Sequence, residues 1–162
     1  MEKVQHIQIK LVNPVMLLLL ALFAAQVSLA AELNDGLQEG KLKPCPDSPN
    51  CISSEQGMIE PVVFSKGDAQ LAWIKLQQVI VSQGGQIESL QSDYLRALFS
   101  TSWMGLKDDV EARLDVPMHR IQLRSALRVG YYDFGANRKR LNNIVRLMRM
   151  SLDPEALKNI YQ

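Results

Sequence analysis

The sequence has few of the residues that most often carry catalysis or bind metals. It contains only two cysteines and two histidines, His6 and His119, in 162 residues. Zinc normally takes four ligands, and His6 lies in an expected signal peptide, so too few ligands remain for a site. No serine stands in a nucleophile-elbow pattern, and no glycine-rich phosphate loop or metal-ligand spacing occurs. We therefore predict no metal and no cofactor, and no motif identifies a catalytic residue.

The first 30 residues have the pattern of a secretory signal peptide. Lys3 and Lys10 precede an apolar run from Val15 to Ala25, and Ser28-Leu29-Ala30 supplies small residues before a cleavage point. The run is shorter than the roughly 20 residues needed to cross a bilayer. We expect cleavage after Ala30 and a periplasmic or secreted protein. The alternative is an uncleaved N-terminal segment that anchors the protein to the inner membrane.

The expected mature chain has no excess of charge of either sign. Residues 1–30 hold two of the 18 basic and one of the 17 acidic residues, so 16 of each remain in 132 residues. Nucleic-acid binding depends on neutralising phosphates, and this balance argues against a nucleic-acid partner. Residues 31–41 lack regular apolar spacing and predict an exposed lead-in, and residues 42–162 predict a single domain.

Cys45 and Cys51 enclose a short segment of turn-forming residues, Pro-Asp-Ser-Pro-Asn. Two cysteines in an exported protein favour a disulfide. We interpret this pair as a staple that holds an N-terminal segment to the domain. A redox-active pair is the alternative, although the six-residue step differs from the Cys-x-x-Cys of the oxidoreductases. A metal-binding pair lacks further ligands.

Apolar residues spaced three and four apart predict two main helices. The first covers Ala69 to Gln83, with Ser65 and Asp68 as a capping-box-like pair and Gly84-Gly85 as its stop. The second begins near Gly135 or Ala136 and ends near Leu152. Asp153-Pro154-Glu155 then predicts the start of a short C-terminal helix.

Alternating apolar and polar residues predict the strands, at residues 59–64, 87–91, 94–103, 109–116 and 120–128. The fold is therefore predicted to be α+β. An antiparallel sheet of four to five strands carries two main helices packed on one face, in the order β-α-β-β-β-β-α, plus the short C-terminal helix.

The last two predicted strands form a hairpin whose register can be derived. Pro117 cannot take the positive φ of a two-residue primed turn, so a four-residue loop from Val116 to His119 fits better. The resulting pairs are Asp115 with Arg120, Leu114 with Ile121, Ala112 with Leu123 and Glu111 with Arg124, with Asp109 diagonal to Arg124 and Arg128. A slip of one residue would bury these charges, which specifies the register.

The candidate site lies where this hairpin leads into the second helix, in the charged stretch Arg124–Arg140. Its candidate ligand-binding residues are Asp109, Glu111, Arg124, Arg128, Asp133, Asn137 and Arg138. Arg138, Lys139 and Arg140 oppose the dipole of the helix start, so something negative should compensate them. A bound phosphate or carboxylate could do so. Alternatively, the carboxylates of this region form an internal ion-pair network with the arginines, and Asp133 or Asn137 caps the helix.

Three motifs together resemble the uncharacterised family catalogued as domain of unknown function 1499. They are Cys45-Pro46-x-x-Pro49-Asn50-Cys51, Asp108-Asp109-Val110-Glu111 and the Arg124–Arg140 stretch. The resemblance covers about residues 42–150 and implies no reaction, because the family has no assigned activity. Leu127 departs from the pattern, since a small polar residue is expected there.

These observations favour a non-catalytic binding module of the cell envelope. Its expected partners are an anionic small molecule, a lipid headgroup or an envelope protein, with membrane contact only through a retained N-terminal segment. Two alternatives stay open. One is a hydrolase that uses Asp109 with Arg124 and Arg128 on a phosphate or carboxylate ester. The other is a purely structural envelope domain.

Overall fold

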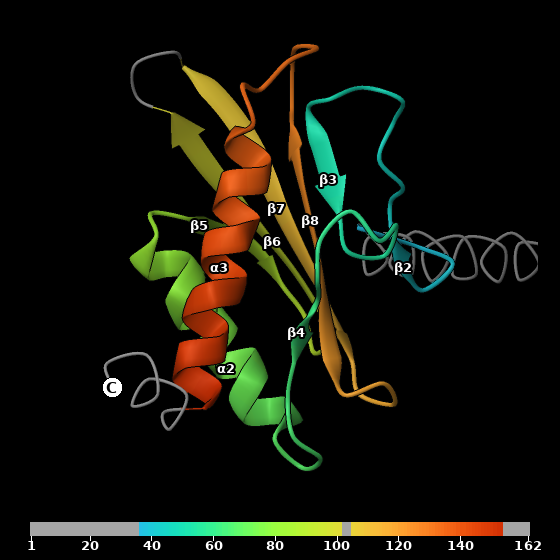
Figure 1. Ribbon diagram of the computed structural model, residues 1–162, viewed down its shortest axis with the longest axis vertical. Coiled ribbons are helices and arrows are strands. Elements are labelled where there is room, and N and C mark those ends of the chain that lie inside the picture. The colour runs from blue at the N-terminus through green and yellow to red at the C-terminus, as the bar shows by residue number, and fades with distance from the viewer. Residues whose placement is uncertain (1–35, 102–104, 154–162) are drawn as a thin grey trace, which may run out of the picture. The chain divides into compact units, whose positions relative to one another are not determined.

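A six-stranded antiparallel sheet forms the centre of the protein (Figure 1). The computed structural model describes residues 36–101 and 105–153. Five strands lie in the order β3-β8-β7-β6-β5, and β4 also pairs with β8. The strands are β3 (Cys51–Ser53), β4 (Val62–Val63), β5 (Gln86–Leu90), β6 (Tyr94–Thr101), β7 (Leu106–Asp115) and β8 (Arg120–Leu127).

Two helices, α2 (Ala69–Ser82) and α3 (Ala136–Leu152), lie across one face of this sheet (Figure 1). They bury their apolar stripes against the strand residues of that face, and one continuous core results. Its fully buried members include Leu76 and Ile80 from α2, Leu141 and Ile144 from α3, and Leu123 from β8. The predicted α+β class with two helices on one face is confirmed.

The β7–β8 hairpin has the register that the sequence predicts. Asp115 pairs with Arg120, Glu111 with Arg124, and the intervening apolar residues with one another. His119 N–H donates to the Val116 carbonyl at 3.1 Å, which closes the four-residue loop. The alternation of apolar and polar residues predicts this register correctly because one face of the hairpin packs in the core and the other face is polar.

The sheet has more strands than the four to five predicted. The additional pairing comes from β3, and a separate two-stranded hairpin joins β1 (Leu37–Gln38) to β2 (Lys41–Leu42). Strands of two or three residues are too short to show an alternating pattern, so the sequence does not reveal them. The short helix expected after Asp153 lies outside the described residues.

The predicted capping box of α2 is wrong. Asp68 is the N-cap residue, but its side chain makes no capping hydrogen bond. Its backbone has φ −94° and ψ 11°, away from the extended geometry in which an N-cap side chain reaches the first turn. The predicted stop is confirmed, because Gly84 adopts a φ of 86° and Gly85 N–H donates to the Ile80 carbonyl at 2.9 Å.

Candidate functional site

Glu111 and Arg124 form an ion pair on the sheet face opposite the helices. Arg124 Nη1 donates to Glu111 Oε2, and the Tyr94 hydroxyl donates to Glu111 Oε1 at 2.9 Å. The side chains of Tyr94 and Glu111 are buried, and that of Arg124 is mostly buried. Both Glu111 oxygens therefore already have donors inside the protein.

Arg128 is held by two carboxylates near the end of β8. Its Nε lies 3.0 and 3.1 Å from the two oxygens of Asp109, and its Nη2 donates to Asp109 at 2.7 Å and to Glu88 at 2.5 Å. The hydrogen bond to Asp109 is the main reason that the pKa of Arg128 lies above its usual value. An external anion would have to compete with both carboxylates for this guanidinium.

Asp133 caps the start of α3. Its Oδ1 accepts from Gly135 N–H at 2.9 Å and its Oδ2 accepts from Asn137 N–H at 2.8 Å. The buried carboxylate supplies the negative charge that a helix start favours, in the place where a bound anion would otherwise sit.

Asn137 lies at the centre of a buried polar cluster beneath α3. Its Oδ1 accepts from Arg140 Nη1 at 2.7 Å and from the Ser125 hydroxyl. Its Nδ2 lies 3.4 Å from Asp108 Oδ1, and Arg140 Nη2 donates to Asp108 Oδ2 at 2.7 Å. The cluster joins α3 to β7 and β8, and its members point into the protein.

The three cations at the start of α3 differ in their partners. Arg140 reaches back to Asp108, and Arg138 Nη1 donates to the Met58 carbonyl at 2.9 Å. Lys139 is exposed and has no ion pair among the described residues. Of these three cations, Arg140 is the one that pairs with a carboxylate among the described residues, whereas Arg138 meets a backbone carbonyl.

The disulfide between Cys45 and Cys51 is present, with a Cα–Cα distance of 5.5 Å. Asn50, inside this loop, connects it to the candidate site. The Asn50 side-chain amide donates to the Gly130 carbonyl, and its own carbonyl accepts from Leu127 N–H and Asn137 Nδ2, each at 3.0 Å. Between the disulfide and the start of α3 is a hollow of about 70 Å³.

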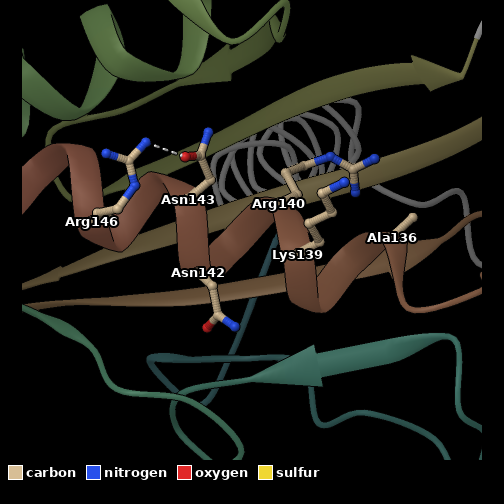
Figure 2. Close-up of a pocket in the computed structure, with 6 residues that line it drawn as sticks. All are labelled: Ala136, Lys139, Arg140, Asn142, Asn143 and Arg146. Carbon is tan, nitrogen blue, oxygen red and sulfur yellow. Dashed lines mark hydrogen bonds between the residues drawn. The ribbon is translucent and has the colours of Figure 1, made fainter.

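A larger groove of about 600 Å³ runs along the exposed side of α3. Figure 2 shows the side chains that line it: Ala136, Lys139, Arg140, Asn142, Asn143 and Arg146. Arg146 Nη2 donates to Asn143 Oδ1 at 2.7 Å, and Asn143 Nδ2 donates to Gln83 Oε1 on the segment that follows α2. Within the part of the chain that the structure describes, Lys139 and Arg146 have no ion pair, and the groove lining contains the amides of Asn142 and Asn143 but no carboxylate.

This groove was not predicted from the sequence. Lys139, Asn143 and Arg146 recur at spacings of four and three, but a polar stripe of this kind usually marks only the solvated side of a helix. The groove differs from an ordinary solvated helix face because no acidic residue is among its lining residues. This feature depends on the fold, which places Asp108 and Asp133 outside the lining.

No helix within the described residues is long and apolar enough to cross a membrane. In the same part of the chain, no cluster of three or more histidine, cysteine, aspartate or glutamate side chains could hold a metal ion.

The family model described as "Protein of unknown function (DUF1499)" matches residues 41–148. A search of curated proteins and a search of solved structures each found no match.

Proposed function

The chain belongs to the DUF1499 family of proteins of unknown function, and we propose that it is a non-catalytic cell-envelope module that binds an anionic ligand in the α3 groove. Because the family has no assigned activity, this role is inferred from the protein's own surface. The main observation in support is that Lys139 and Arg146 line this groove without a carboxylate partner among the described residues. Phosphate and carboxylate groups are the ligands that such cations recognise.

The other arginines support this location by being occupied. Arg124, Arg128 and Arg140 each make an ion pair with a carboxylate of the protein. An external anion there would have to compete with a carboxylate. Among the described residues Lys139 has no ion pair, and the side-chain partners of Arg146 are the neutral acceptors Asn143 Oδ1 and Met150 Sδ. The amides of Asn142 and Asn143 could add hydrogen bonds to a phosphate or carboxylate oxygen.

Placement in the cell envelope has two sources of support. The N-terminal sequence has the signal-peptide pattern, and a disulfide is typical of oxidising compartments. Ester hydrolysis by Asp109 has less support, because both of its oxygens already accept hydrogen bonds from Arg128.

Thermal unfolding in the presence of inorganic phosphate, pyrophosphate or citrate tests the proposal. A ligand that binds only the folded state raises the melting temperature in a concentration-dependent manner. We expect Lys139→Gln with Arg146→Gln to abolish the rise.

The matched control is Arg138→Gln with Arg149→Gln, which removes the same charge from exposed positions of the same helix that do not line the groove. This variant should keep at least half of the rise. If no anion raises the melting temperature of the parent protein, or if the groove variant responds like the control, the proposal is wrong and a purely structural role gains support.

A further inference from the structure

The loop between β8 and α3 exposes an unusual density of large apolar side chains. Within residues 129–134, Val129 is 82%, Tyr131 71%, Tyr132 53% and Phe134 71% exposed to solvent. We call these four side chains the apolar tip. In Figure 1 this loop lies at one end of the sheet, where β8 leads into α3.

The loop is anchored to the domain. The Asn50 side chain donates to the Gly130 carbonyl, and the Asp133 carboxylate accepts from Gly135 and Asn137. Asp133, the only charged residue of the six, is buried while its apolar neighbours face water. This reverses the usual arrangement of a surface loop, and contiguous exposed apolar groups of this kind mark interaction sites.

Phe134 shows that folding of the domain does not explain this arrangement. It has a φ of 55°, which is uncommon for a bulky residue, and its ring contacts Tyr132 edge-on with the centroids 5.0 Å apart. A strained and exposed aromatic residue contributes no core packing, which favours a role in a contact outside the domain.

The charge next to the apolar tip is cationic. Lys107, whose carbonyl accepts from Arg128 N–H, is exposed, as are Arg138 and Lys139 at the start of α3. The acidic residues of this end are occupied: Asp108 by Arg140, Asp109 by Arg128 and Asp133 by the helix start. Asp47, in the disulfide loop, is the exposed acidic exception.

Aromatic side chains at a tip with lysine and arginine behind them match the interface of a lipid bilayer. Tyrosine and phenylalanine partition into the headgroup region, and cations set back from them meet anionic headgroups. We propose that the apolar tip inserts into the interfacial layer of an anionic membrane. This contact is additional to the retained N-terminal segment considered from the sequence. Of the residues named for it, only Lys139 also lines the α3 groove.

Co-sedimentation of residues 31–162, the chain expected after signal-peptide cleavage, with lipid vesicles tests the proposal. Vesicles of phosphatidylcholine and phosphatidylglycerol in equal parts should bind the protein, and vesicles of phosphatidylcholine alone should bind it more weakly. The variant Val129→Ser/Tyr131→Ser/Phe134→Ser should lose affinity by on the order of tenfold or more. The control Leu71→Ser/Val81→Ser, which removes exposed apolar side chains from α2, should bind like the parent.

Thermal unfolding of each variant confirms that it is folded, and Tyr131→Ser alone provides a milder variant that should still weaken vesicle binding measurably. Absence of vesicle binding by the parent would overturn the proposal. So would binding that survives in the tip variant but is lost in Lys139→Gln/Arg146→Gln, a result that leaves the anion groove standing. If the parent instead self-associates in sedimentation velocity and the tip variant does not, a second copy of the chain covers the tip.

Discussion

At the residue scale, Asp108 depends strongly on one partner. Its side chain is buried, Arg140 Nη2 lies 2.7 Å from its Oδ2, and Asn137 adds only a 3.4 Å contact. We expect Arg140→Met to lower the free energy of unfolding by about 3 kcal/mol, because the variant leaves a buried carboxylate without its cation. Chemical denaturation measures this loss.

Arg138→Met is the matched control, since Arg138 is exposed and, among the described residues, its side chain donates only to the Met58 carbonyl. Its effect should be within about 0.5 kcal/mol. The double variant Asp108→Leu/Arg140→Met removes both charges and should recover most of the stability lost in Arg140→Met. Similar losses in Arg138→Met and Arg140→Met would show that the ion pair is not what stabilises this position.

At the element scale, the start of α3 depends on the Asp133 cap. Asp133→Ala removes two hydrogen bonds to backbone N–H groups and a negative charge at the helix start, where three consecutive cations follow. We expect a loss of about 1–2 kcal/mol in the free energy of unfolding, measured by chemical denaturation.

Asp68→Ala at the start of α2 is the corresponding control. Asp68 holds the N-cap position but makes no side-chain capping bond, so its replacement should change stability by less than about 0.5 kcal/mol. A loss at Asp68 as large as that at Asp133 would contradict the different capping geometry of the two helices.

At the scale of the whole molecule, the disulfide stabilises the domain and supports the loop between β8 and α3 through Asn50. A bridge across six residues is worth about 2 kcal/mol through the entropy of the unfolded chain. We expect Cys45→Ser/Cys51→Ser to lose about this amount. The parent under reducing conditions should unfold at the same denaturant concentration as the variant.

The reduced parent and the double variant thus check each other. If neither is less stable than the oxidised parent, the bridge does not restrict the unfolded chain. If only the reduced parent loses stability, the serine side chains have formed a compensating contact, which Cys45→Ala/Cys51→Ala would remove.

Several features of this protein could be predicted because their cause is local in the sequence. Alternation around Pro117 determines the hairpin register down to Glu111 opposite Arg124, and the Gly84-Gly85 pair determines the end of α2. The two cysteines, in a chain whose N-terminal sequence predicts export, indicate the bridge between Cys45 and Cys51. β1, β2 and β3 have no such signal, since two or three residues are too few to show a period.

The sequence alone determined the α+β class and the hairpin, because apolar residues spaced two, or three and four, apart show which face of a strand or helix is buried. It also indicated the disulfide, through two cysteines close together in a chain with a predicted signal peptide. Only the tertiary structure decided which carboxylate each cation meets. Asp108 and Arg140 are 32 residues apart, and they pair because α3 packs on β8, whose neighbouring strand β7 carries Asp108. The position of that helix therefore determines which cations are neutralised and leaves Lys139 and Arg146 exposed in the groove.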